Sequence, residues 1–172
     1  MPAARDSNDI ETRADCERLV RTFYGRALTD PIIGFIFVDV AKLDLEAHVP
    51  RITSFWETIL LGERTYGGGA FAPHARLHMQ VGLRRGHFVQ WLNLWTATVD
   101  ELFAGERAEL AKAHAQRVAG AFYGRLQTLP APADAAAGLA VTQHQPRSAA
   151  SSGARQDPDA TSNAPNSVAK SQ

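Results

Sequence analysis

The sequence has little of several features that mark common classes of protein. Its single cysteine, Cys16, has no second cysteine with which to form a disulfide inside the chain, and this fits a reducing compartment. No apolar run approaches the ~20 residues that a membrane-spanning helix needs. Residues 1–9 are polar and contain no apolar stretch of signal-peptide length. We therefore expect a cytoplasmic protein.

An excess of charge of one sign is also missing. The 18 Lys and Arg residues balance the 18 Asp and Glu residues, so the formal net charge at pH 7 is zero. Proteins that bind nucleic acid or a membrane surface usually carry a basic patch or arm, and none is visible here. We therefore expect a protein, most simply a monomer, that binds neither nucleic acid nor membranes.

Composition divides the chain into three parts. Its 172 residues suit one domain. From residue 130 onward there is no Phe, Trp or Tyr, and Ala, Ser, Pro and Gln are frequent. Such a segment buries too little apolar surface to offset the entropy lost on ordering. The sequence therefore predicts a flexible N-terminal segment over 1–14, a folded domain over 15–129 and a disordered tail over 130–172.

Apolar side chains within the folded domain recur at spacings of three and four residues, which is the pattern of one helix face. Such stripes run from Cys16 to Ala27, from His48 to Leu60, from Phe88 to Phe103 and from Leu110 to Phe122. No alternation typical of a strand is present. The sequence predicts an all-α bundle of four main helices, joined by short pieces that include a helical turn over 32–37.

Aromatic and histidine side chains suggest a flat cofactor. Aromatic rings on inward stripes can line such a ligand, although ordinary core packing explains them as well. His74 follows Pro73, and a proline in the first turn of a short helix presets the direction of the next side chain. Haem iron needs one rigidly held axial imidazole, and His48 could face the other side of the same ligand. His78, four residues after His74, could share a zinc ion with it, but no third ligand stands nearby.

Short motifs stand in a fixed order along the chain: Phe23-Tyr24, Asp30-Pro31 with Gly34 and Ile36-Phe37, His48, Phe55-Trp56, Leu60-Leu61-Gly62, Tyr66-Gly67, His74, His87-Phe88, Trp91-Leu92, Thr98-Val99-Asp100 and Phe103 to Gly105. Together they cover roughly residues 15–126. In order and spacing, this set resembles the group III truncated haemoglobins of bacteria. One departure is Ala70, since many relatives have proline four residues before the histidine that binds iron.

The resemblance implies a truncated globin fold, in which two pairs of helices form a two-over-two sandwich around haem b. It implies that His74 is the proximal ligand to the iron. It also assigns three side chains to the distal side and three aromatic side chains to the surroundings of the porphyrin. The distal group is Tyr24, His48 and Trp91, and the aromatic group is Phe37, Phe55 and Trp56.

The resemblance further implies a haem protein that binds dioxygen, nitric oxide or other small ligands. It allows detoxification of nitric oxide or peroxide, as well as oxygen or redox sensing. No glycine-rich dinucleotide motif is present, so an enzymatic cycle would need an external reductase. A competing interpretation is a haem-free helical interaction module, in which the aromatic stripes are core and the histidines are incidental.

Overall fold

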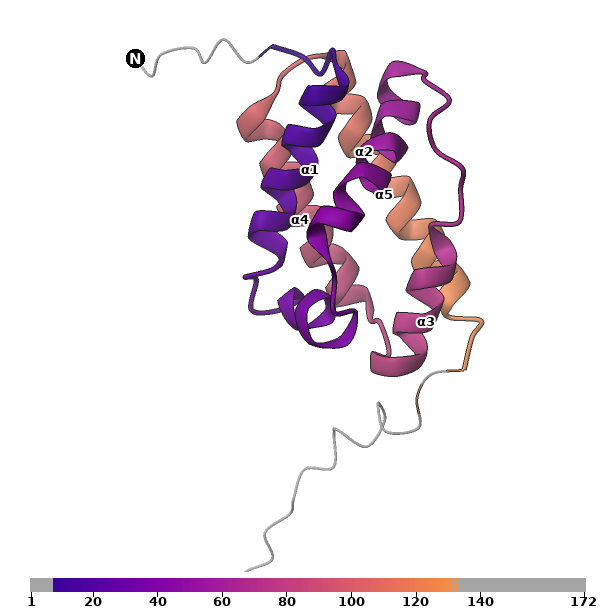
Figure 1. The fold of residues 1–172 in the computed structure, drawn as a ribbon. Coiled ribbons are helices and arrows are strands. Elements are labelled where there is room, and N and C mark those ends of the chain that lie inside the picture. Colours follow the sequence, from indigo (N-terminus) through magenta and orange to yellow (C-terminus); the bar gives the residue numbers. More distant parts are fainter. Residues whose placement is uncertain (1–7, 131, 133–172) are drawn as a thin grey trace, which may run out of the picture. The chain divides into compact units, whose positions relative to one another are not determined.

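The computed structural model describes residues 8–130 and 132, and these residues form helices and connecting segments without any strand (Figure 1). The elements are α1 (Arg13–Ala27), the π-helix η1 (Ile36–Val40), α2 (Leu45–Leu61), α3 (Phe71–Val81), α4 (Arg85–Leu102) and α5 (Glu106–Leu126). The all-α prediction is confirmed. The predicted tail lies outside the described residues, except for Pro130 and Pro132.

Local signals explain where the first two long helices begin and end. The Thr12 hydroxyl accepts the backbone N–H of Asp15, and the Asp15 carboxylate accepts the backbone N–H of Thr12, which forms a capping box at the start of α1. Asp44 caps α2 by accepting the backbone N–H of Ala47. The α2 helix stops at Gly62, where φ is +77°, a left-handed conformation that glycine adopts without steric cost.

The four long helices form two stacked pairs. Helix α1 packs on α2 and α4 packs on α5, while α1 also contacts α4 and α2 contacts α5. The interface between the pairs is aromatic: Phe23 and Trp95 are both fully buried, and their rings meet edge to face with centroids 5.3 Å apart. A search of the described residues for a membrane-spanning helix finds no candidate.

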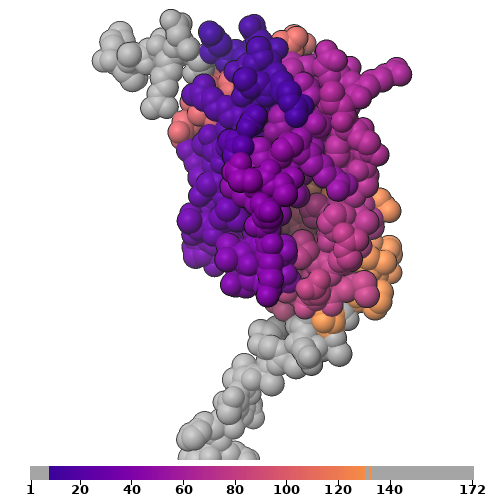
Figure 2. All heavy atoms as spheres, in the orientation of Figure 1, coloured from indigo at the N-terminus to yellow at the C-terminus, as the bar shows by residue number. Residues whose placement is uncertain are grey.

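Helix α3 is held differently from the other helices. It packs against η1 and α5, whereas no close packing links it to α2 within the described part of the chain. A loop over 62–70 joins these two helices, and its glycines Gly68 and Gly69 have positive φ. Figure 2 shows the surface hollowed between the purple residues of η1 and early α2 and the pink residues of α3. We call this space between α2 and α3 the slot.

The residues just before α1 pack against the start of α5. The Asp9 carboxylate accepts the backbone N–H groups of Arg107 and Ala108, each at 2.8 Å. Ile10 is fully buried, and its carbonyl accepts a hydrogen bond from the Arg107 side chain. Residues 8–12 are therefore anchored to the helical bundle, although they lie within the segment that the sequence predicts to be flexible.

Candidate functional site

Two histidines stand on the helices that border the slot. His48 is the fourth residue of α2 and His74 the fourth residue of α3. Both side chains are partly buried. The pKa of His48 is lowered, first by burial and then by the nearby charges of Arg51 and His74. The imidazole of His74, 26 positions away in the sequence, is thus close enough to affect the pKa of His48.

The ring of His74 has a defined tautomer. Its Nδ1 lies 2.8 Å from the carbonyl oxygen of Ala70, and because a carbonyl can only accept, Nδ1 carries the proton and donates it. Burial lowers the pKa of His74, and the Ala70 hydrogen bond only partly opposes this, so the ring is neutral at pH 7. The ring of Phe122 meets the imidazole edge to face at 4.8 Å and limits its rotation. Nε2 of His74 therefore keeps an available lone pair.

A second polar pair joins α1 to α2. The Tyr24 hydroxyl lies 3.1 Å from Nε2 of His48, and the two rings are nearly perpendicular. Tyr24 is buried, which raises its pKa well above its usual value. The phenol therefore stays protonated and keeps a proton that it can donate, either to His48 or to a ligand beside it.

Two more of the sequence-predicted residues lie beside this pair. Phe37, in η1, packs its ring edge to face against Tyr24 with centroids 5.8 Å apart. Trp91, in α4, reaches the same region through Phe23, whose ring contacts both Trp91 and Tyr24. The predicted helical turn over 32–37 overlaps turn and helical residues over 31–35, which continue into the π-helix over 36–40, and such local distortions often accompany functional sites.

Phe55 and Trp56 lie farther from the Tyr24–His48 pair within the same network of aromatic rings. Trp56 is buried and stacks on Trp95 at 4.3 Å. Phe55 contacts Tyr66 and His114. Among the described residues, neither ring contacts the Tyr24–His48 pair directly, and both are connected to it only through Trp95 and Phe23.

Several contributors to this region were not recognised in the sequence. Phe122 belongs to an apolar stripe that the sequence reveals, but nothing in the pattern indicates its contact with His74.

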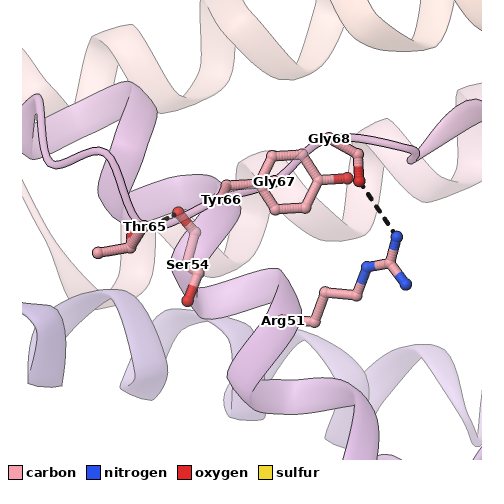
Figure 3. Close-up of a pocket in the computed structure, with 6 residues that line it drawn as sticks. All are labelled: Arg51, Ser54, Thr65, Tyr66, Gly67 and Gly68. Carbon is pink, nitrogen blue, oxygen red and sulfur yellow. Dashed lines mark hydrogen bonds between the residues drawn. The ribbon is translucent and has the colours of Figure 1, made fainter.

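Figure 3 shows a further polar pocket, of about 330 Å³, which lies between α2 and the loop over 62–70. In that pocket Arg51 donates to the carbonyl of Gly68 at 3.2 Å, and the ring of Tyr66 forms one wall.

A zinc site at His74 and His78 finds no support. No group of three His, Cys, Asp or Glu side chains within the described residues is arranged to hold a metal ion. His78 is buried, and its Nδ1 has no hydrogen-bond partner there. Within the part of the chain that the structure describes, His74 and His78 are therefore not part of such a group of three.

The stacked helix pairs, with a separate short helix across a slot, define a truncated globin fold. The chain is similar in structure to a group III truncated hemoglobin from Campylobacter jejuni, with a TM-score of 0.60 and 26% sequence identity over 69% of this chain and 94% of the other. No family model matches the sequence, and no curated protein is similar enough to match it. The family resemblance and the fold predicted from the ordered motifs are thus confirmed.

Proposed function

We propose that this chain is a globin-type haem protein in which His74 is the axial ligand. The observation that carries the proposal is the hydrogen bond from Nδ1 of His74 to the Ala70 carbonyl. Histidines that bind metals usually donate their other ring N–H to a carbonyl or carboxylate, which fixes the tautomer and increases the basicity of the ligating nitrogen. The similar solved protein is a hemoglobin by its printed title.

The surroundings of the slot fit a flat macrocycle. Any packing of α2 against α3 in the described residues is at most slight, so a planar group can enter between them without separating two closely packed helices. Aromatic rings flank the two histidines, with Phe37 beside the Tyr24–His48 pair and Phe122 beside His74. An axial imidazole on one helix and polar donors from two others form the donor set that a haem site uses.

When bound, haem would supply an iron that binds diatomic ligands and exchanges single electrons. The protein's own part is to hold a polar ligand beside the Tyr24 hydroxyl. A hydrogen bond to a charged acceptor contributes about 1.5–3 kcal/mol, which slows ligand release roughly ten- to a hundredfold. Trp91 is the second proposed donor. His48, which shares the Tyr24 proton at 3.1 Å, is either a third donor or a gate.

Slow release of the small ligand is better suited to a reaction in the slot than to transport of that ligand. We therefore favour binding of dioxygen or nitric oxide, with detoxification of nitric oxide or peroxide as the reaction. Tyr24 and Trp91 would orient the small ligand, and the pair of buried Tyr24 with half-buried His48 would limit the entry of water. Electrons for repeated turnover would come from an external reductase.

The absorption spectrum of the purified chain with added hemin tests this proposal. We expect an intense Soret band that shifts with carbon monoxide after reduction and is lost in His74→Ala. The control is His114→Gln, because His114 is a half-buried histidine on α5 that contacts Phe55 and Trp56. A chain that is colourless as purified and takes up no added hemin would overturn the haem proposal in favour of an interaction module. Nitric oxide consumption with a reductase present then separates an enzyme from a carrier or sensor.

A further inference from the structure

All three tryptophans of the chain lie in one continuous stack. The rings of Trp91 and Trp95 are parallel within 3°, with centroids 5.7 Å apart. Those of Trp95 and Trp56 are within 18° of parallel, at 4.3 Å. Trp95 and Trp56 are 1% and 3% exposed, so the centre of the stack is shielded from water. Edge-to-face packing is the commoner arrangement for aromatic pairs in this core, and the tryptophans depart from it.

The stack connects the slot with the protein surface. At the inner end Trp91 contacts Phe23, whose ring contacts Tyr24. At the outer end Phe55 contacts Trp56 at 5.1 Å and Tyr66 at 5.3 Å. Tyr66 forms a wall of the open pocket of about 330 Å³ (Figure 3). A series of ring contacts thus runs from the Tyr24–His48 pair to a tyrosine that solvent can reach.

Tryptophan and tyrosine are the aromatic side chains that lose an electron most readily. Electrons move between such rings in short hops when the rings are in contact, and a phenylalanine between two of them serves as a bridge that is not itself oxidised. A tyrosine is a stable end point only where its phenol proton can leave. Tyr66 borders open solvent, whereas the hydroxyl of Tyr24 is buried against His48.

We propose that Tyr66 is the surface terminus of an electron relay through Trp56, Trp95 and Trp91, which carries single electrons from a small donor in the Tyr66 pocket towards the slot. This proposal rests on the proposed haem function for its oxidant, a hydroperoxide reduced in the slot. It assigns a second site to the chain, namely the Tyr66 pocket. This pocket would take a small phenol or enediol as the electron donor.

The electrons and atoms balance as follows. A molecule of hydrogen peroxide takes up two electrons and two protons, its O–O bond breaks and two water molecules form. A haem held by His74 would supply both of these electrons first. Tyr66 returns one of them along the stack, loses its phenol proton to water and becomes a neutral tyrosyl radical. A donor molecule in the pocket then restores one electron and one proton to Tyr66. A second transfer from Tyr66 along the stack returns the second electron to the slot in the same way.

Pulse radiolysis of the full chain without added cofactor tests the path directly. Azide radicals oxidise tryptophan selectively, and the half-buried Trp91 is accessible to them. We expect the tryptophanyl absorption to decay while a tyrosyl absorption grows in a unimolecular step. Tyr66→Phe should abolish this growth. Tyr123→Phe is the matched control, because Tyr123 contacts Phe88 and lies off the stack. Unchanged growth in Tyr66→Phe would overturn the relay.

A second measurement uses the hemin-loaded chain. After addition of hydrogen peroxide, spin trapping with peptide mapping should place the radical adduct on Tyr66, and a phenol or ascorbate should remove it. An adduct on Tyr24 alone would overturn the proposal. The two measurements separate the hypotheses: a chain that binds no haem overturns the proposed function, while the azide experiment still decides the relay. Trp56→Phe, which interrupts the stack, should suppress the Tyr66 signal in both.

Discussion

At the scale of single residues, the site depends on which atom holds each proton. His74 presents an available nitrogen because a carbonyl one helical turn earlier takes its other N–H. Tyr24 keeps its proton because burial raises its pKa. Both conditions arise from the surroundings of the side chain, and both can be changed by one substitution.

Replacement of Tyr24 by phenylalanine removes the hydroxyl while the ring contacts with Phe23 and Phe37 remain. In the hemin-loaded protein we expect dioxygen release to become roughly ten- to a hundredfold faster, since a hydrogen bond to a charged acceptor contributes about 1.5–3 kcal/mol. Stopped-flow measurement of the dissociation rate checks this, with Tyr123→Phe as control. An unchanged rate would remove Tyr24 from ligand stabilisation.

At the scale of elements, helix ends provide the clearest tests of the local structure. Gly62 ends α2 at φ +77°, whereas Gly25 lies within α1 and has open space where a Cβ would be. Gly62→Ala should lower the free energy of unfolding by about 1–2 kcal/mol, because a side chain is strained at positive φ. Gly25→Ala should raise it by about 0.5–1 kcal/mol through helix propensity. Urea denaturation measures both, and equal effects would contradict the assigned conformations.

The start of α5 is capped by a residue far from it in the sequence. The Asp9 carboxylate accepts the N–H groups of Arg107 and Ala108, so Asp9→Ala should cost about 0.5–2 kcal/mol, the usual range for a lost N-cap. This cap requires glycine at position 105, since a Cβ at Gly105 would overlap the Asp9 side chain.

Asp9 also makes stability depend on pH. Burial raises its pKa, but hydrogen bonds from backbone N–H groups and the charge of Arg107 outweigh burial, so its pKa is below the usual value of 3.8. A lowered pKa in the folded state means that the contribution is complete above 3.8 and is lost as the pH falls through the folded value. We expect the stability difference between the native chain and Asp9→Asn to shrink with acidification below pH ~4. A difference that stays constant to pH ~2 would contradict this carboxylate role.

At the scale of the whole molecule, the slot lies between the well-packed helix pairs and α3, which makes fewer packing contacts. The two helix pairs share a continuous core, while α3 packs mainly against η1 and α5 among the described elements. Segments with fewer buried contacts open at lower free energy than the core. In the absence of a bound group, α3 should therefore be the first helix to exchange its amide hydrogens.

Hydrogen exchange with and without hemin tests this arrangement. A ligand that binds only the folded state stabilises it, and the stabilisation grows with the logarithm of ligand concentration above Kd. Hemin should slow exchange most in α3 and early α2, the helices that carry His74 and His48, and should change α5 less. His74→Ala should remove the effect in α3. Uniform protection of all helices would indicate general stabilisation without a site in the slot.

Local sequence is sufficient for the helices, their approximate ends and the order of the family motifs, because spacing of apolar residues and capping chemistry act within a few neighbouring positions. The prediction of His74 as a ligand uses local information of the same kind, since this histidine follows a proline in the first turn of its helix. The site contacts are different. The Tyr24–His48 bond joins residues 24 apart, the Trp56–Trp95 stack joins two helices, and Asp9 reaches α5 across almost a hundred residues. Such contacts depend on how the helices pack in three dimensions. The spacing of residues within one helix does not determine which helix faces come into contact.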